Sequence, residues 1–284
     1  MKKKKEQEIV QTYEISATNN KMINYNVYEL SKKEKFIYFL IAFIVGAGVA
    51  YLFYGGIGKD DYGNPTLLTY ILDVVIMAVI GFFSGKLFLP IRKKSIINSR
   101  KKELRAQFID LLDSLSTSIS SGKNVPSAFT NAREDLLVQY SSDAYIVQEV
   151  DNIISGINNN INVGSMLINF GERSGIQDIR IFGRVFETAY SKGANLKDVV
   201  RNCHEILSSK CEIENEIETK VASNKNEQYI MLVMPIILIT MIKMAGSDFA
   251  NNFTSPTGLI STTIAIGAFV GAYFLGRKIL NIEV

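Results

Sequence analysis

Three Gly-Lys dipeptides, which begin at Gly58, Gly85 and Gly122, are the residues that first point to chemistry. A phosphate-binding loop needs another glycine five residues before that glycine and Ser or Thr after the lysine. These residues are required because the backbone wraps around the phosphates and the hydroxyl binds magnesium. In this chain the three lysines are followed by Asp, Leu and Asn, and none of the pairs has the upstream glycine. The spacing therefore excludes a nucleotide-binding loop of this type at all three pairs.

The sequence also contains no convincing metal site and no convincing catalytic nucleophile. His204 is the only histidine, and its neighbours Cys203, Glu205 and Cys211 do not converge on one helical face, as a tetrahedral site requires. With a single histidine and no Gly-x-Ser-x-Gly motif, a hydrolytic triad has no basis. The two cysteines are eight positions apart on one predicted helix, about 12 Å and too far for a disulfide, so we expect free thiols. We expect no catalytic, cofactor-binding or metal residues and no enzymatic activity.

The elements that surround these residues are strongly apolar. The chain has 284 residues, 47% of them hydrophobic, and a mean hydropathy of +0.13. Each of four stretches has about 16 to 23 apolar residues, close to the length that crosses a bilayer. They are Phe36 to Phe53, Leu67 to Leu89, Tyr229 to Met244 and Leu259 to Leu275. The last two are the shortest, and a buried soluble helix is the alternative for them.

The distribution of basic residues predicts the orientation. Seven lie between Arg92 and Arg105, whereas the loop from Gly55 to Thr66 contains only Lys59. The same bias recurs where Arg277 and Lys278 follow the last stretch. Because basic residues are retained on the cytoplasmic side, both termini and the long central segment are expected there.

The sequence thus predicts an all-α, polytopic membrane protein in four parts. They are a flexible basic cytoplasmic tail (1–35), a first transmembrane helix pair (36–90), a cytoplasmic helical domain (91–228) and a second transmembrane pair (229–284). The lysines of the tail either rest on anionic lipid or only aid solubility.

The cytoplasmic segment is predicted to form about six helices. Gly122 and Gly193 stand where helices end, and Asn124, with Pro126, and Asn195 stand where the next helices begin. A shift of 71 residues superimposes one corner on the other, together with the apolar residues around it. We interpret this as a duplicated helical hairpin; chance similarity of two amphipathic hairpins is the alternative.

Acidic residues at two places in the sequence are candidates for a specific role. Asp73 lies inside the second apolar stretch, where an ionisable group is expected to be functional, and we expect either a polar contact with another span or access to water. Farther along, Glu212, Glu214, Glu216 and Glu218 repel one another along a helix. They are either a solvated helix face or a docking surface for a basic partner.

The order of several motifs resembles a known family. FIDLLDSLSTSISSGKNVPSAF is followed by GERSGIQDIRIFGRVFETAYSKGANLKDVV and by a Glu-rich helix that ends in KNEQYIMLVMPIIL. Together these segments resemble the type II secretion system F domain, in particular the TadB branch of the tight-adherence (Flp) pilus machinery. The resemblance runs from about Arg100 to the C-terminus, and the matching residues outside the Gly122 and Gly193 corners are Arg173, Ser174, Gly175, Glu227 and Pro235. Residues 1–30 have no counterpart in the family.

The resemblance implies a non-catalytic platform in the cytoplasmic (inner) membrane. Its implied partners are a cytoplasmic secretion ATPase, a paralogous TadC-like membrane protein, pilin or prepilin subunits and the lipid bilayer, with assembly into a homo- or hetero-oligomer. A membrane sensor is the first alternative, but both predicted outer loops are short, about 12 to 14 residues. A transporter subunit is the second, but only Asp73 and Pro235 are candidate intramembrane features for it.

Overall fold

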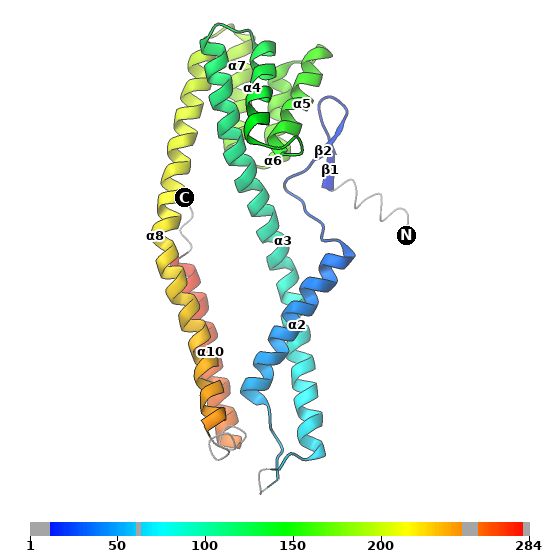
Figure 1. Cartoon of the computed structure of the whole chain (residues 1–284), viewed down its shortest axis with the longest axis vertical. Helices are drawn as coiled ribbons and strands as arrows, with labels where there is room; N and C mark the ends of the chain where they lie inside the picture. The colour runs from blue at the N-terminus through cyan, green and yellow to red at the C-terminus, as the bar shows by residue number, and fades with distance from the viewer. Residues whose placement is uncertain (1–11, 61–63, 246–254, 281–284) are drawn as a thin grey trace. The chain divides into compact units, whose positions relative to one another are not determined.

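The computed structural model describes residues 12–60, 64–245 and 255–280, and apart from one short hairpin their regular structure is helical (Figure 1). The helices are α2 (Lys32–Tyr54), α3 (Leu67–Ser120), α4 (Val125–Gln139), α5 (Tyr145–Asn158), α6 (Val163–Ser174), α7 (Gln177–Ser191), α8 (Leu196–Ala245) and α10 (Pro256–Leu280). The strands are β1 (Tyr13–Ile15) and β2 (Lys21–Ile23). The predicted all-helical class is therefore confirmed.

The chain divides into two compact units. The first, here the core unit, comprises Met1–Glu29 and Lys93–Ile213, and the second, the span unit, comprises Leu30–Arg92 and Glu214–Val284. On α3 this division lies close to the expected boundary at 90/91. On α8 it lies at 213/214 instead of 228/229, because the residues that follow Ile213 do not pack with the core unit. Helices α3 and α8 each belong to both units and cross the division without a break.

The span unit holds four helices that are long and apolar enough to cross a membrane, which confirms the predicted number. At most 11% of the residues in any of their apolar windows are buried. Helices α2 and α3 approach closely: a Cβ at Gly85 would lie 2.6 Å from the ring of Phe39, and Ser84 donates a hydrogen bond to the carbonyl of Ala42 (3.1 Å). Gly85, part of one Gly-Lys pair, thus serves helix packing.

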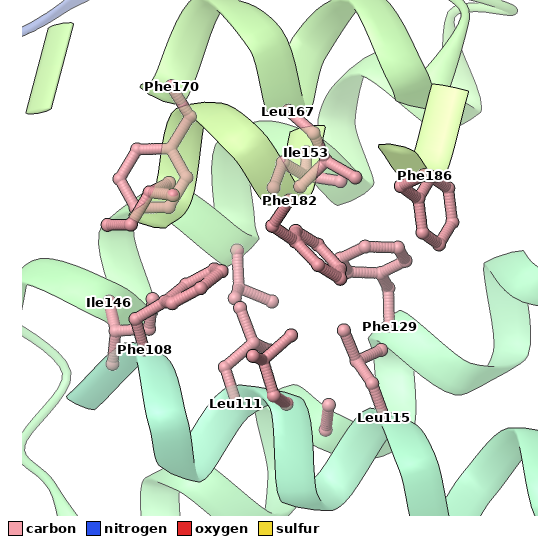
Figure 2. Packing of buried hydrophobic residues seen from close by; sticks show 14 of the residues in the cluster. Phe108, Leu111, Leu115, Phe129, Ile146, Ile153, Leu167, Phe170, Phe182 and Phe186 are labelled. Atoms are coloured by element: carbon pink, nitrogen blue, oxygen red, sulfur yellow. The ribbon is translucent and has the colours of Figure 1, made fainter. Parts of the chain in front are cut away.

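The core unit is built around aromatic side chains from several helices. Figure 2 shows Phe108 of α3 near Phe170 and Phe182, and the ring centroids lie 6.1 and 5.4 Å from that of Phe108. Helical spacing predicts one apolar face on this part of α3, made of Leu104, Phe108, Leu111, Leu112, Leu115 and Ile119, and all of them are buried except Ile119, which is partly buried. Burial of this face against α4 to α7 is the main source of the unit's stability.

Helical spacing predicts one apolar face at the start of α8, made of Leu196, Val199, Val200, Cys203, Ile206 and Leu207, but the face that contacts this core is narrower. Val200 and Leu207 are buried, but Ile206, expected on the same face, is 66% exposed. One residue turns a helix by about 100°, so Ile206 points away when Leu207 points inward. Salt bridges of Asp178 with Arg105 (2.9 Å) and Lys210 (3.1 Å) hold α3, α7 and α8 together.

The expected flexible tail is wrong for the described residues 12–35. Strands β1 and β2 pair in antiparallel register, with Tyr13 opposite Ile23, and the ring of Tyr25 is only 1% exposed. Lys32 to Lys35 already belong to α2, with Ser31 as its N-cap. Strands of three residues are too short to produce a recognisable alternation of apolar and polar residues, so no periodic pattern indicates them. The MKKKK segment lies outside the described residues.

The two predicted corners have the same backbone geometry. Gly122 and Gly193 have φ angles of 86° and 67°, in the left-handed region that glycine adopts without strain. The residue after each glycine donates to a carbonyl five positions back, from Lys123 to Ser118 (3.2 Å) and from Ala194 to Ala189 (2.9 Å). This is the hydrogen-bond pattern of a Schellman C-cap.

The helices after both corners also begin alike. Asn124 accepts from the N–H of Ser127 (3.0 Å), and Asn195 accepts from the N–H of Lys197 (3.2 Å). Pro126 lies in the first turn of α4, where no backbone donor is needed.

Candidate functional site: a docking site around Arg173 and Glu149

A buried ion pair lies between α5 and α6. Arg173, in the last turn of α6, donates to both carboxylate oxygens of Glu149 on α5, at 2.9 and 2.6 Å. Both side chains are 1% exposed. A buried charge is tolerated only when it is paired and its hydrogen-bonding groups are satisfied. Although burial opposes the charge of Arg173, the hydrogen bond and the negative charge of Glu149 raise its pKa.

Tyr25 of the N-terminal segment completes this network. Its hydroxyl donates to Glu149 (3.0 Å), and its ring meets that of Tyr145 edge-on with centroids 5.6 Å apart. Burial, the charge of Glu149 and this hydrogen bond raise the pKa of Tyr25 far above its ordinary value. Tyr25 is therefore a neutral donor, and Glu149 accepts three hydrogen bonds.

The same arginine also binds the backbone of the N-terminal segment. Its guanidinium donates to the carbonyl of Ile23 (3.2 Å), and its own carbonyl accepts from the N–H of Tyr25 (3.1 Å). On the other side, Asn169 accepts from the Nε of Arg173 (2.8 Å) and fixes the plane of the guanidinium. Arg173 thus bridges a buried carboxylate and an extended piece of chain.

Ser174 and Gly175 shape the neighbouring turn. The Ser174 hydroxyl donates to the carbonyl of Gly171 (2.8 Å) and accepts from the N–H of Ile176 (3.1 Å), which closes the end of α6. Gly175 has a φ of 61°, and a Cβ there would overlap the side-chain oxygen of Asn26. The Arg-Ser-Gly motif therefore forms the surface on which residues 23–26 lie.

Further polar contacts hold the segment on both sides of Tyr25. Ser16 and Thr18 hydrogen-bond to the side chain of Asn152 on α5. Lys101 donates to Asn26 (2.7 Å), and the guanidinium of Arg100 lies 4.3 Å from the ring centroid of Tyr28. Burial and the charge of Arg180 lower the pKa of Lys101.

Asp73 lies in the span unit with a partner that the sequence did not indicate. It accepts from the N–H of Gly56 (2.9 Å), in the turn after α2, and thus binds backbone instead of a polar side chain of another span. Lys243 donates to the neighbouring carbonyl of Gly55 (3.4 Å), and both side chains line a cavity of about 470 Å³ with a mixed polar and apolar lining. Asp73 therefore holds the turn between α2 and α3.

Glu227 and Pro235, the two remaining motif residues, lie on the part of α8 within the span unit. Pro235 lines an apolar cavity of about 600 Å³ formed by residues of α2, α8 and α10 and by Ile80 of α3. Glu227 is exposed on α8, next to Gln228, which donates to the carbonyl of Tyr273 (3.2 Å). Glu227 and Pro235 therefore belong to the span unit, whereas Arg173 belongs to the core unit.

The four glutamates of α8 do not share one face. Residues two apart on a helix differ by about 200° in direction, so Glu212 and Glu216 point away from Glu214 and Glu218. Glu216 pairs with Lys220 (2.7 Å), and three of the four are exposed, Glu214 being half-buried. The four glutamates thus lie as two pairs on different sides of this stretch of α8.

Sequence reasoning found Arg173 but missed Glu149 and Tyr25. The available signal was Glu149 itself, a charge on the face of α5 that buries Ile146, Val150 and Ile153. No sequence pattern indicated that Tyr25, some 124 residues earlier, is its partner. The arrangement of Arg173, Glu149 and Tyr25 holds residues 23–26 against α5 and α6 by hydrogen bonds.

Comparisons of the chain with protein-family models, curated proteins and solved structures found no match.

Proposed function

We propose that this chain is a non-catalytic platform protein of a Tad/Flp-type pilus or type II secretion-like machine. It would couple a cytoplasmic secretion ATPase to the extraction of pilin and the assembly of a filament. The motifs that resemble the TadB branch of the F-domain family point to this function. The observation that carries the proposal is that α3 and α8 run unbroken from apolar, exposed stretches into the core unit.

Continuous helices are suited to transmitting force. All backbone hydrogen bonds of a helix lie within it, so a displacement at one end moves the other end. Helix α3 has 54 residues and α8 has 50, and each contains one internal proline, Pro90 and Pro235. A proline removes one backbone hydrogen bond and is a common site of helix bending. Motion of the core unit would reach the span unit through these two continuous helices, and Pro90 and Pro235 are the positions at which the helices would bend.

The repeated corner also supports the assignment. The hydrogen bonds at Gly122 and Gly193 are equivalent, as expected if the helical hairpin is duplicated. We further propose that the core unit, both termini and the stretch of α8 from Glu212 to Glu218 face the cytoplasm, where the ATPase would meet the core unit and this stretch. This orientation follows from the basic residues between Arg92 and Arg105.

Affinity purification of the full chain from its native membranes, in mild detergent, tests this proposal. A hexameric secretion ATPase and a second F-domain membrane protein are expected to co-purify. A variant that carries Lys in place of Glu212, Glu214, Glu216 and Glu218 is expected to lose the ATPase. The matched control changes Glu134 and Asp135, both exposed on α4, to Lys.

The outcomes separate the parts of the proposal. Recovery of neither partner would contradict the platform function, and an unchanged ATPase yield with the α8 variant would exclude the acidic stretch as its contact. The chain purified alone is expected to hydrolyse no ATP above background. Turnover that persists after removal of contaminating ATPase would contradict a non-catalytic role.

A further inference from the structure

We propose that the surface formed by α5, α6 and the adjoining part of α3 is a peptide-binding groove. Its resident ligand is residues 12–28 of the same chain, here called the strap. The recognised ligand is an extended segment that carries a tyrosine followed by an asparagine, Tyr25 and Asn26 in the strap. The strap leaves and rebinds this groove without unfolding of the core unit. This inference does not depend on the proposed platform function.

The strap is held as a bound peptide is held. Its one bulky side chain that is almost fully buried is Tyr25, whereas Tyr13 and Ile15 of the hairpin are 45% and 64% exposed. The other contacts of the strap are mainly polar: hydrogen bonds at Ile23, Asn26 and Thr18 and the cation–π contact at Tyr28. Ile23 in addition packs partly buried against the core. A single aromatic anchor combined with backbone hydrogen bonds is the pattern of peptide recognition, in which few residues supply most of the binding energy.

The groove has a rigid base without the strap. Glu149 and Arg173 are on separate helices, and Asn169 orients Arg173 from within α6. The ring contacts of Phe108 with Phe170 and Phe182 join α3, α6 and α7 without a strap residue, although Tyr25 belongs to the same buried hydrophobic cluster. Departure of the strap would leave Glu149 and Arg173 paired with each other and would admit water to the groove. Water can solvate the carboxylate in place of the Tyr25 hydroxyl, so release does not leave a lone charge in an apolar core.

Neighbouring groups set the register of the ligand. Asn26 fits because Gly175 has no side chain, and its oxygen is bound by Lys101. Ser16 and Thr18 meet Asn152 farther along α5. A shifted segment would place neither the phenol at Glu149 nor the amide at Gly175.

The test uses the chain lacking residues 1–28, purified in detergent, and a fluorescein-labelled peptide of residues 12–30 as the probe. Fluorescence anisotropy is expected to show saturable binding. A Tyr25→Phe peptide is expected to bind roughly 10- to 100-fold more weakly, because the hydrogen bond to a buried carboxylate is lost. A Tyr13→Phe peptide is the matched control and is expected to bind unchanged, since Tyr13 is exposed. The intact chain is expected to bind the probe far more weakly, because its groove is occupied.

A shortened chain that keeps its helicity and cooperative melting but does not bind the peptide would overturn the proposal. If the shortened chain does not fold, a protease site inserted between Glu29 and Leu30 of the intact chain replaces it. After cleavage, excess labelled peptide is expected to exchange into the groove. A cleaved strap that no excess of peptide displaces would show that residues 12–28 are a permanent part of the core, and would equally overturn the proposal.

Discussion

The two units contain the same apolar residue types in opposite environments. In the core unit, Phe108, Leu111 and Phe182 are at most 1% exposed. In the span unit, Phe36, Ile44 and Val45 are 60% to 65% exposed. Isolated exposed apolar residues are ordinary on protein surfaces, but four helices of them are not. The core unit thus supplies its own apolar environment, whereas the exposed apolar helices of the span unit are those expected of a multi-pass membrane protein.

Charges differ between the units in a corresponding way. The core unit buries the ion pair of Arg173 and Glu149 together with the Tyr25 hydroxyl, whereas Asp73 of the span unit accepts one backbone hydrogen bond and lines a cavity. The buried pair depends on its partners because water cannot replace them while the strap is in place. This contrast leads to the following expectations.

The largest effect is expected from neutralising the buried carboxylate. Glu149→Gln leaves Arg173 buried without its counter-charge and should lower the free energy of unfolding by about 3–5 kcal/mol. Asp151→Asn, two residues along the same helix, is the matched control. It breaks only the exposed pair with Arg133 and should cost less than about 1 kcal/mol.

The free energy of unfolding is measured by denaturant titration in detergent. The extent of unfolding is monitored through the rate at which Cys203 is labelled, in a Cys211→Ser background. Cys203 is half-buried, and burial raises the pKa of its thiol, so the native state should react slowly. Equal losses of unfolding free energy in the Glu149→Gln and Asp151→Asn variants would contradict the role assigned to the buried ion pair.

The next effect contrasts two exposed valines. Val45 of α2 is 61% exposed and Val138 of α4 is 87% exposed. Val45→Asp should cost about 2.5–3.5 kcal/mol in membrane insertion, because it places a charge near the middle of an apolar helix. Val138→Asp should change stability by no more than about 0.5 kcal/mol. The fraction of protein that resists carbonate extraction from membranes measures the first, and thermal melting measures the second. Full membrane integration of the Val45 variant would argue against α2 as a span.

The two corners should respond alike. Gly122→Ala and Gly193→Ala each force a left-handed conformation on a side chain and should cost about 1–2 kcal/mol, with no steric term because both sites face open space. Gly175→Ala should cost more, since its Cβ also displaces Asn26. The free energies of unfolding of the three variants are compared. Markedly unequal losses of stability at Gly122 and Gly193 would contradict the expectation that the two corners are equivalent.

The smallest effect is a dependence on alkaline pH. Because the pKa of Tyr25 is raised in the folded state, the unfolded chain loses this proton first, and the stabilisation declines as pH rises above about 10. At pH 10.5 the loss should be about 0.8 kcal/mol. Glu149, Arg173 and Tyr145 surround the phenol, and Arg173 stays charged throughout.

A Tyr25→Phe variant isolates this contribution. Lys101 gives the opposite slope, since its lowered pKa makes the unfolded chain bind more protons below about pH 10.5. The variant should keep the slope from Lys101 and lack that from Tyr25. Identical pH profiles for wild type and variant between pH 9.5 and 10.5 would contradict the shift assigned to Tyr25.

Local patterns in the sequence determined much of the fold. The apolar face of α3, the four long apolar helices and the ends of helices at Gly122 and Gly193 all follow from periodicity, length and the conformational freedom of glycine. These features depend on residues within a few turns of one another, so they can be read without knowledge of distant contacts. The failure of the Gly-Lys pairs as phosphate loops is likewise a matter of local spacing.

The docking site was decided by tertiary structure. Whether Glu149 would be a solvated charge or a buried one depends on Arg173 and on Tyr25, which lies 124 residues earlier. The strap has too few regular residues for a periodic signal, and its order comes from contacts with helices that the chain forms later. The sequence also did not indicate that α3 and α8 are each one continuous helix, because the apolar and polar stretches of one helix look like separate elements. Sequence alone therefore determined the helices and the environment that each requires, and only the folded chain brought Tyr25, Glu149 and Arg173 together.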